Sequence, residues 1–258
     1  MLRYRKFKIS RNISYIFFIA LLIFIPTFKI VKMDIAHNQS WLFGQEINLS
    51  GAFKPIVVIV GIISVFIILA NLILGRVFCG WICPGGFLAQ LQEYFKKLTK
   101  EKKFLYYILT FISSILFSLV FFNWITDIRV FFYPTNPAFL PLLLAFIVIT
   151  AFFYFEAFLG EKWCRVYCPT GIYHKITPFN HIVKPFLVKK ESCEDCKACI
   201  KACPMGLDPR KMASINNFDR GIQACIVCGE CVDACASVNI PKGKEGIIKF
   251  VKDIKKFN

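Results

Sequence analysis

Four stretches of the chain are almost entirely apolar and are long enough to cross a bilayer as helices, which takes about 20 residues each. They run from Ile13 to Val31, Pro55 to Leu74, Phe104 to Phe122 and Phe139 to Leu159. No small-residue cleavage site follows Phe28, so we expect the first stretch to remain as an anchor. The pattern predicts an α-helical membrane protein with four transmembrane helices.

After Thr177 the chain becomes polar, and twelve cysteines are divided between the two parts. We predict a transmembrane domain at residues 1–177, a small α+β domain at 178–244 and a basic tail at 245–258. In the tail, Ile247, Ile248, Val251 and Ile254 follow helical spacing with lysines elsewhere. This spacing predicts an amphipathic helix that lies on the anionic inner leaflet or packs against the protein.

The basic residues predict the orientation of the chain. Most of them lie before the first apolar stretch, between the second and third, and after Gly160. Because cytoplasmic loops carry the excess of Lys and Arg, we expect a multi-pass protein of the cytoplasmic (inner) membrane with both termini and every cysteine on the cytoplasmic side. The net charge is +16, but the lysines flank apolar stretches in a chain that is 57% apolar. We therefore expect contact with the lipid bilayer and no nucleic-acid partner.

A short pattern occurs twice, each time after two apolar stretches. Residues 75–86 read GRVFCGWICPGG and residues 160–171 read GEKWCRVYCPTG, so the first Gly, both Cys, the Pro and the last Gly coincide. Copies that each follow two spans share one orientation in the membrane. We expect two parallel two-helix repeats whose cysteine pairs face each other.

Eight cysteines have the spacing of iron–sulfur ligands. Each motif reads C-x2-C-x2-C-x3-C, followed by Pro204 in the first and by Ala236 in the second. In paired motifs of this kind the fourth cysteine ligates the other cluster. We predict two [4Fe–4S] clusters in a bacterial ferredoxin-like domain, one held by Cys193, Cys196, Cys199 and Cys235, the other by Cys225, Cys228, Cys231 and Cys203.

Paired zinc sites are the alternative for these cysteines. Tetrahedral zinc usually takes C-x2-C hooks that are far apart, not three consecutive ligands in each half. Small or apolar residues between the ligands also let backbone amides approach the sulfurs and limit water, as clusters require. Clusters fully capped by Cys have no open substrate position, so we predict an electron relay and assign no catalytic residue.

Four further cysteines form two C-x3-C-P motifs at the cytoplasmic ends of the second and fourth stretches: Cys79, Cys83, Cys164 and Cys168. An i, i+4 pair on a helical turn points both sulfurs the same way, and the repeat would bring both pairs together. The set is a further cluster or metal site, a redox-active thiol site, or four inert thiols; its repetition favours a functional role.

Few other groups in the apolar stretches carry chemistry. Asn71 and Glu156 occupy equivalent positions of the two repeats. The acid either relays protons to a quinone or, as is commoner, snorkels and pairs with Lys162 or Arg165. The stretches contain no His, and the chain has no G-x-G-x-x-G or P-loop motif. We therefore expect no haem, flavin, nicotinamide or ATP site.

The order of these motifs resembles the NapH-type membrane ferredoxins of periplasmic nitrate reductase systems over nearly the whole chain. Two stretches precede Cys79-x3-Cys83-Pro84, two precede Cys164-x3-Cys168-Pro169, and a two-cluster block follows. Similar cores occur in NosR-type proteins of nitrous oxide respiration and CcoG-type oxidase assembly factors, but we expect this chain to lack their extra domains. The resemblance implies quinol-linked electron transfer with clusters on the cytoplasmic side.

The motifs leave three hypotheses for function. The first is a relay from the quinone pool through the clusters to another redox subunit or a ferredoxin. The second is an assembly factor that uses the C-x3-C-P thiols to reduce a metal such as copper. The third is a membrane anchor with structural clusters that docks a periplasmic complex. The motifs encode neither the direction of electron flow nor the terminal acceptor.

Overall fold

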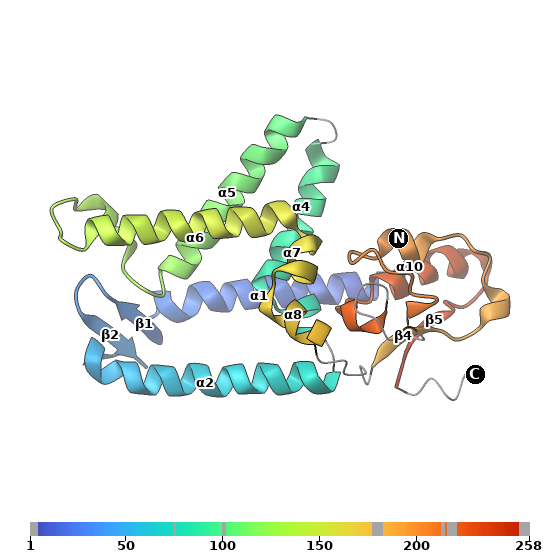
Figure 1. Cartoon of the computed structure of the whole chain (residues 1–258), viewed down its shortest axis with the longest axis horizontal. Helices are drawn as coiled ribbons and strands as arrows, with labels where there is room; N and C mark the ends of the chain where they lie inside the picture. The colour runs from blue at the N-terminus through green and yellow to red at the C-terminus, as the bar shows by residue number, and fades with distance from the viewer. Residues whose placement is uncertain are drawn as a thin grey trace. The chain divides into compact units, whose positions relative to one another are not determined.

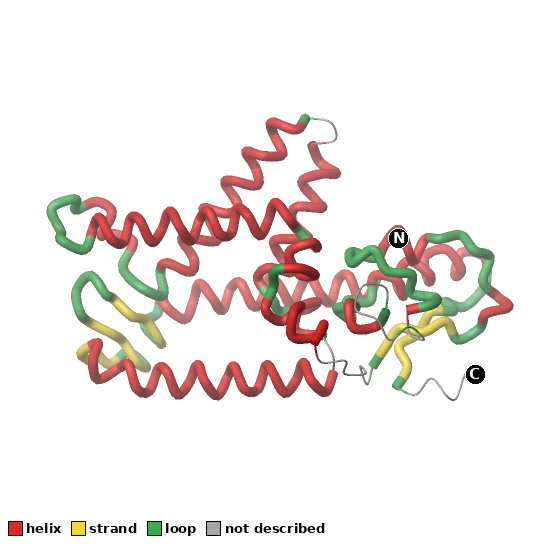
Figure 2. The backbone as a smooth tube through the Cα atoms, in the orientation of Figure 1, coloured by secondary structure: helices red, strands yellow, loops and turns green. Residues whose placement is uncertain are grey.

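Helices make up most of the described chain, as Figure 1 and Figure 2 show. The structure is a computed structural model and describes residues 5–74, 76–99, 102–176, 183–212, 215 and 221–252. Its α-helices are α1 (Lys6–Thr27), α2 (Leu49–Leu74), α3 (Val77–Trp81), α4 (Pro84–Thr99), α5 (Lys103–Phe122), α6 (Phe139–Leu159), α7 (Glu161–Val166), α8 (Pro169–Ile176), α9 (Ala198–Ala202) and α10 (Glu230–Asn239). Its strands are β1 (Val31–Asp34), β2 (Gln39–Leu42), β3 (Gln45–Asn48), β4 (Lys184–Leu187) and β5 (Ile248–Val251).

The chain forms two compact units. The first contains Met1–Tyr15, Val65–Gly86 and Glu161–Asn258, and the second contains Ile16–Ser64 and Phe87–Gly160. Every cysteine belongs to the first unit, so the candidate chemistry gathers there. The domain boundary predicted between residues 177 and 178 lies outside the described residues.

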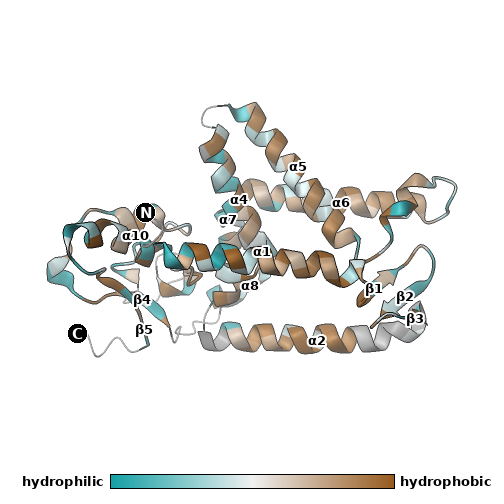
Figure 3. Cartoon of the chain, turned by 180° about the vertical axis from the view of Figure 1, so that it is seen from behind, coloured by the Kyte–Doolittle hydropathy of each residue, from teal (hydrophilic) through white to brown (hydrophobic). Residues whose placement is uncertain are grey.

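Three helices are long and apolar enough to cross a membrane: α1, α5 and α6. Figure 3 shows their apolar colouring, and large side chains such as Phe17, Phe104 and Leu140 are exposed on them, as expected of surfaces that face lipid. Helix α6 has the predicted bounds, whereas α1 ends at Thr27, before the predicted end of the first stretch. The second predicted stretch lies in α2, whose described apolar part is the shorter Val57–Asn71, so a crossing there stays a prediction.

In the second unit, small hydroxyl side chains lie along the buried side of α5. Thr110 donates to the Tyr106 carbonyl, Ser114 to the Thr110 carbonyl and Ser118 to the Ser114 carbonyl, each at 2.8 Å. Their hydroxyl groups are thus satisfied within the helix, which an apolar surrounding requires. Phe153 of α6 packs against Phe117 and Phe121 of α5, with ring centroids 5.9 and 5.1 Å apart.

The loop predicted between the first two stretches forms a small sheet in this unit. Strands β1, β2 and β3 are antiparallel neighbours in that order. The buried Asp34 at the end of β1 accepts a hydrogen bond from Thr126 at 3.1 Å and lies 2.8 Å from Nδ1 of His37. The connector is therefore an ordered element held to the loop after α5.

In the first unit, the N-terminal end of α1 contacts the first turn of α10. The N–H groups of Phe7 and Lys8, at 3.3 and 2.9 Å, donate to the buried Asp233 carboxylate, and Arg11 forms an ion pair with Glu230. N–H groups in the first turn have no intrahelical acceptor, and negative charge is favoured near them. The acidic residues in the first turn of α10 therefore hold the N-terminal end of α1 in place.

The prediction of a helical tail is wrong for residues 248–251. These residues form β5, which pairs antiparallel with β4 so that Leu187 lies opposite Ile248 and Lys184 opposite Val251. Ile248 and Val251 are buried, and Ile248 packs in one apolar cluster with Leu187. A short run of branched apolar residues fits both the helical period of 3.6 and the strand period of 2. Pairing with strand β4 favours the strand. Residues 253–258 of the predicted tail lie outside the described part.

Candidate functional site

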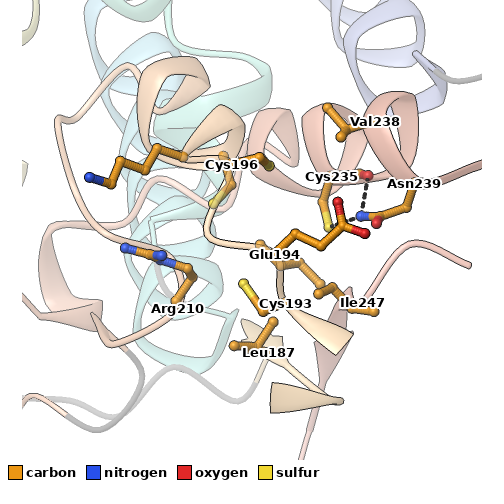
Figure 4. A pocket seen from close by; sticks show the side chains of 12 residues that line it. Leu187, Cys193, Glu194, Cys196, Arg210, Cys235, Val238, Asn239 and Ile247 are labelled. Atoms are coloured by element: carbon orange, nitrogen blue, oxygen red, sulfur yellow. Dashed lines mark hydrogen bonds between the residues drawn. The ribbon is translucent and has the colours of Figure 1, made fainter. Parts of the chain in front are cut away.

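The eight ferredoxin-type cysteines line two separate hollows in the first unit. The first hollow is lined by Cys193, Cys196, Cys199 and Cys235. Figure 4 shows Cys193, Cys196 and Cys235 around it, and we call it the exposed site because Cys196 is exposed. The second is lined by Cys203, Cys225, Cys228 and Cys231, of which the last three are buried; we call it the buried site. The two groups are the ligand sets expected from the spacing.

Two short helices divide their cysteines between the hollows. Helix α10 carries Cys231, which lines the buried site, and Cys235, which lines the exposed site. Helix α9 carries Cys199 of the exposed site, and Cys203 of the buried site follows directly after it. Four residues advance a helix by about 6 Å. The C-x3-C spacing therefore places one sulfur at each of two adjacent sites.

The two cysteine loops have the same backbone course. Asp195 and Lys197 have positive φ values of 51° and 58°, and the equivalent Val227 and Gly229 have 53° and 81°. A β-branched residue such as Val227 rarely adopts this conformation, so the rest of the loop holds it there. Alternating left-handed residues turn successive amides inward and form concavities that receive anions and iron–sulfur clusters. Both loops are wound in the same way around a central group.

At each site, a cysteine sulfur accepts hydrogen bonds of the kind that stabilise cluster ligands. At the buried site, the amides of Leu207 and Val227 donate to the sulfurs of Cys203 and Cys225, each at 3.4 Å. At the exposed site, Nδ2 of Asn239 donates to the Cys235 sulfur at 3.3 Å, as the dashed lines in Figure 4 show. Such bonds stabilise the negative charge of thiolate ligands. Four cysteines line each hollow, although no group of three or more potential ligands among the described residues is arranged to hold a single metal ion. Four thiols around a hollow and donors to their sulfurs are the chemistry that a [4Fe–4S] cluster requires.

Burial raises the pKa of several of these thiols, so they stay protonated at neutral pH when no metal is bound. It raises the pKa of Cys199 to about 11 and, against the charge of Arg11, that of Cys228 to about 11. It also raises the pKa of Cys225 and Cys231. Metal ligands must be deprotonated, so loading either site releases protons and depends on pH.

The membrane-edge cysteines, Cys79, Cys83, Cys164 and Cys168, lie close enough for their charges to interact. The charge of Cys168 acts on Cys79, and the charges of Cys79 and Cys164 act on Cys83. Burial raises the pKa of Cys83, whereas the amides of Gly86 and Gly85 at the start of α4 donate to its sulfur and oppose the rise. The four cysteines therefore lie in one region, and a shared site between the two pairs stays a prediction.

The expected single helical turn for each pair is wrong. Cys79 lies in α3, which ends at Trp81, whereas Cys83 directly precedes α4. The second copy is built alike: the N–H of Cys83 donates to the Phe78 carbonyl at 3.0 Å and that of Cys168 to the equivalent Trp163 carbonyl at 2.9 Å. A proline follows each of these cysteines, and the residue before proline is disfavoured in the helical region. Each helix therefore stops and a new one begins with proline at its first position.

The glycines that follow allow the two helices of each copy to touch. A Cβ at Gly86 would overlap the Cys79 carbonyl oxygen, and one at Gly171 would overlap the equivalent Cys164 carbonyl oxygen. Only glycine gives so close an approach of backbone to backbone. The last Gly of the repeated pattern is thus a packing requirement in both copies.

The first C-x3-C-P motif lies directly against the buried site. A Cβ at Gly80 would overlap the Ile226 carbonyl oxygen, and Nε1 of Trp81 donates to the Val227 carbonyl at 3.0 Å. The buried hydroxyl of Tyr15 donates to the Gly80 carbonyl at 2.9 Å. Cys79 is part of the same apolar cluster as Cys225 and Cys228, and Cys164 packs against it. The membrane-edge cysteines and the buried site therefore form one continuous region.

Comparison with known proteins agrees with this arrangement. Residues 56–101 and 137–177 match a family described as a 4Fe-4S binding domain, and residues 186–253 match a 4Fe-4S dicluster domain. The uncharacterized protein MJ0750 of Methanocaldococcus jannaschii is 28% identical over 250 residues, which are 89% of this chain and 93% of that protein. MJ0749 of the same organism is 30% identical over 197 residues, 76% of this chain and 73% of that protein. The ferredoxin-type protein NapH of Haemophilus influenzae is 22% identical over 194 residues, 67% of this chain and 64% of that protein. No solved structure matches the chain significantly.

This chain belongs to the NapH-type membrane ferredoxins. It is accordingly an iron–sulfur protein of electron transport, and its apolar helices are those of a membrane protein. The NapH-type pattern of the sequence was identified correctly from its cysteine motifs.

Two residues that shape the NapH-type site were not singled out from the sequence, Arg76 and Gly80. The repeat carries a signal for both. Arg76 aligns with Glu161, and Gly80 aligns with Arg165, so the copies differ at these positions. A glycine that replaces a large residue in one copy indicates a close approach there, and Gly80 makes it with Ile226.

Proposed function

We propose that this chain is a membrane-bound electron relay that takes electrons from quinol and passes them through two [4Fe–4S] clusters to a redox partner on the cytoplasmic side. The observation that carries the proposal is the pair of hollows, each lined by four cysteines. When bound, each cluster accepts and gives one electron. The protein's residues hold the clusters, limit water around the buried one and leave the other accessible.

The surroundings of the two sites support an order of transfer. The buried site packs against Cys79 and Cys164 at the ends of the apolar segments. The exposed site has Cys196 at the surface and charged side chains around it, including Glu194, Lys197 and Arg210. Because electron transfer slows steeply with distance, electrons from the membrane enter at the buried site and leave past Cys196. The acceptor is another redox subunit or a soluble ferredoxin.

The proposal includes the architecture expected from the repeat. Four crossing helices form two parallel repeats, with both termini and all cysteines in the cytoplasm. Cys79, Cys83, Cys164 and Cys168 then hold a further cluster at the membrane edge, between quinol and the buried site. The match of residues 56–101 and 137–177 to a 4Fe-4S binding domain supports this assignment, because both C-x3-C-P motifs fall within it.

An anaerobic iron count with EPR tests the proposal. The full chain, purified in detergent, is expected to contain about twelve iron atoms, four in each of three clusters. A quinol analogue is expected to reduce them, and replacement of all four membrane-edge cysteines by serine is expected to abolish this reduction while eight irons remain. Quinol-dependent reduction that survives this replacement would contradict the role of the membrane edge.

Metal reduction is a second candidate, which the four membrane-edge thiols favour. Soft thiolates select Cu(I), and the Cys83 sulfur accepts amide donors that stabilise its thiolate form. If this candidate holds, copper binding and copper reduction are lost in the four-serine variant, whereas quinol reduction of the clusters is unchanged. The same variant thus separates the two functions.

A further inference from the structure

We propose that Trp81 and Arg165, one from each C-x3-C-P motif, are positioning residues of the buried site. Each donates a hydrogen bond to a backbone carbonyl beside the ligand cysteines, and the two bonds hold the two ligand segments of that site in place. The inference rests on the proposed function, because these bonds have this role only where a cluster occupies the buried site.

Trp81 contacts the loop that carries three cysteines of the buried site. It is the last residue of α3, and its Nε1 donates to the Val227 carbonyl at 3.0 Å. Val227 is buried and lies between two ligand cysteines of that loop. Next to Trp81, Gly80 lies so close to the Ile226 carbonyl oxygen that a Cβ would overlap it, and Ile226 lines the hollow. The first C-x3-C-P motif therefore packs directly against this wall of the buried site.

Val227 has a backbone conformation that needs support. Its φ is 53°, and the left-handed region is unfavourable for a β-branched residue. In this conformation its N–H donates to the Cys225 sulfur at 3.4 Å. The bond from Trp81 fixes the carbonyl of the same residue, so it opposes a return of the backbone to the extended region, which would turn the N–H away from the sulfur. Trp81 therefore holds the strained residue from outside the loop.

The equivalent residue of the exposed site has a different support. Asp195 has a φ of 51°, a conformation that a short polar side chain adopts more readily than a β-branched one. Its carboxylate pairs with Arg210, which belongs to the same cysteine-rich block and lines the exposed hollow. The exposed loop is thus supported from within its own block, whereas a residue of the membrane-edge motif supports the buried loop.

Arg165 reaches the segment that supplies the fourth cysteine of the buried site. Its Nη1 donates to the Met205 carbonyl at 3.3 Å. Met205 is buried, follows Cys203 by two residues and lines the hollow together with it. In the repeat, Arg165 aligns with Gly80, the neighbour of Trp81. Adjoining positions of the two copies thus contact both chain segments that supply ligands to the buried site.

Release of the buried cluster to an iron chelator, followed by EPR of the full chain in detergent, measures the hold of Trp81. The buried cluster's signal is the one that Cys225→Ser lacks. Trp81→Phe keeps an aromatic ring but leaves a buried carbonyl without its donor, so we expect about tenfold faster release, with the exposed cluster unaffected. Trp124→Phe is the matched control, because Trp124 donates to the Leu22 carbonyl at 2.9 Å within the other unit. Equal release in both variants would overturn the role of Trp81.

Val227→Gly separates a hold on the loop from packing of the indole. Glycine adopts positive φ without strain, so the loop keeps its course when Trp81 is replaced. In a chain that carries Val227→Gly, we expect Trp81→Phe to accelerate release less than about threefold. The same acceleration in both backgrounds would overturn the inference. If Trp81→Phe assembles no buried cluster, addition of Val227→Gly decides: return of the signal supports the inference, and continued absence overturns it.

Arg165→Met tests the second bond, because it keeps the apolar stem and removes the donor. We expect about threefold faster release, less than for Trp81→Phe because the bond is longer. Arg165→Lys retains a donor and should restore most of the unmodified rate. Lys162→Met is the control, since it removes an exposed cation from the same helix; an equal effect would overturn the role of Arg165.

The same samples distinguish this inference from the proposed function. Release at the unmodified rate in both Trp81→Phe and Arg165→Met contradicts this inference alone. Absence of any cluster from the unmodified chain contradicts the proposed function as well.

Discussion

The buried site and the exposed site have the same ligand spacing and the same loop conformation, yet their sulfurs lie in different surroundings. At the buried site, apolar side chains such as Met205, Leu207 and Met212 line the hollow, and each is at most 3% exposed. At the exposed site, Glu194 and Arg210 line the hollow beside Cys196. The loops therefore group the cysteines in the same way in both cases, and the packing around them provides the difference in access.

Under the proposed function, this difference gives the two sites different tasks within one relay. A cluster in dry, apolar surroundings exchanges electrons only with groups packed against it, here the membrane-edge region. A cluster with one ligand at the surface meets a partner in solution. Four experiments test or sharpen this contrast.

The contact between the membrane edge and the buried site is the first target. Gly80→Ala places a Cβ against the Ile226 carbonyl oxygen, where backbone lies on both sides and must shift. We expect destabilisation of about 1–3 kcal/mol and loss of the buried cluster. Iron analysis and EPR should show that the exposed cluster remains. Gly61→Ala is the control, because no atom lies within 4 Å of its Cβ position; equal iron loss in both variants would refute a specific role for the contact.

Single ligand replacements compare the sites directly. Cys225→Ser changes a buried ligand in the main apolar cluster, whereas Cys196→Ser changes an exposed one. We expect each variant to lose its own cluster, and Cys225→Ser to lower the unfolding temperature as well, because an empty apolar hollow remains inside the protein. Circular dichroism on heating measures this. Similar unfolding temperatures in both variants would contradict the contrast in packing.

Acidification should affect the membrane-edge side before the exposed site. Burial, with the charge of Arg76 added, lowers the pKa of His174 to about 4, and hydrogen bonds from Lys242 and Lys244 lower the pKa of Glu194 to about 2. Below pH 6.5 the unfolded chain protonates His174 while the folded chain does not, so stability falls from there toward pH 4. The contribution of Glu194 is fully present above its ordinary pKa of 4.5 and is lost only as the pH falls toward 2.

From pH 7 to pH 5 we therefore expect a loss of about 2 kcal/mol that comes from His174. The midpoint of heat-induced cluster loss at the two pH values measures it. The loss should become smaller in His174→Gln, where only the protonation of the ligand thiols remains, and should persist in full in Glu194→Gln. An unchanged loss in His174→Gln would assign it to another group.

A hydrogen bond to one ligand gives the smallest expected effect. Asn239→Leu removes the donor to the Cys235 sulfur, and we expect the exposed cluster's reduction equilibrium to shift less than tenfold toward the oxidised form. The buried cluster should keep its potential. Ser237→Ala is the control on the same helix, because Ser237 is exposed and donates to the Ala234 carbonyl. A shift of both clusters in Asn239→Leu would show that the sites are not tuned separately.

The cysteine spacing predicted the grouping of the eight ligands because that grouping is local. Three ligands of each site follow one another in a short loop, and the fourth is one helical turn beyond the last ligand of the other loop. The helix α6 was also predicted with its bounds, since a long apolar run has one stable form in lipid. That the cysteines act as ligands stays a prediction until iron is measured.

Two predictions are wrong, one because of a distant partner and one because of a neighbouring residue. The spacing of Ile247, Ile248 and Val251 predicts a helix, but strand β4 pairs with residues 248–251. The C-x3-C spacing predicts a single helical turn for each pair, but Pro84 and Pro169 start new helices. The second error could have been avoided from the sequence alone, because a proline disfavours helix in the residue before it.

By itself the sequence determined the division of the eight cysteines into two groups and the apolar helices α1, α5 and α6, because each depends on spacing within a short piece of chain. Only the tertiary structure decided that Gly80 lies against Ile226, that Arg76 reaches the Cys164 carbonyl, and that one cysteine site is buried while the other has Cys196 at the surface. Burial and charge proximity are sums over residues far apart in the chain, and no local motif encodes them.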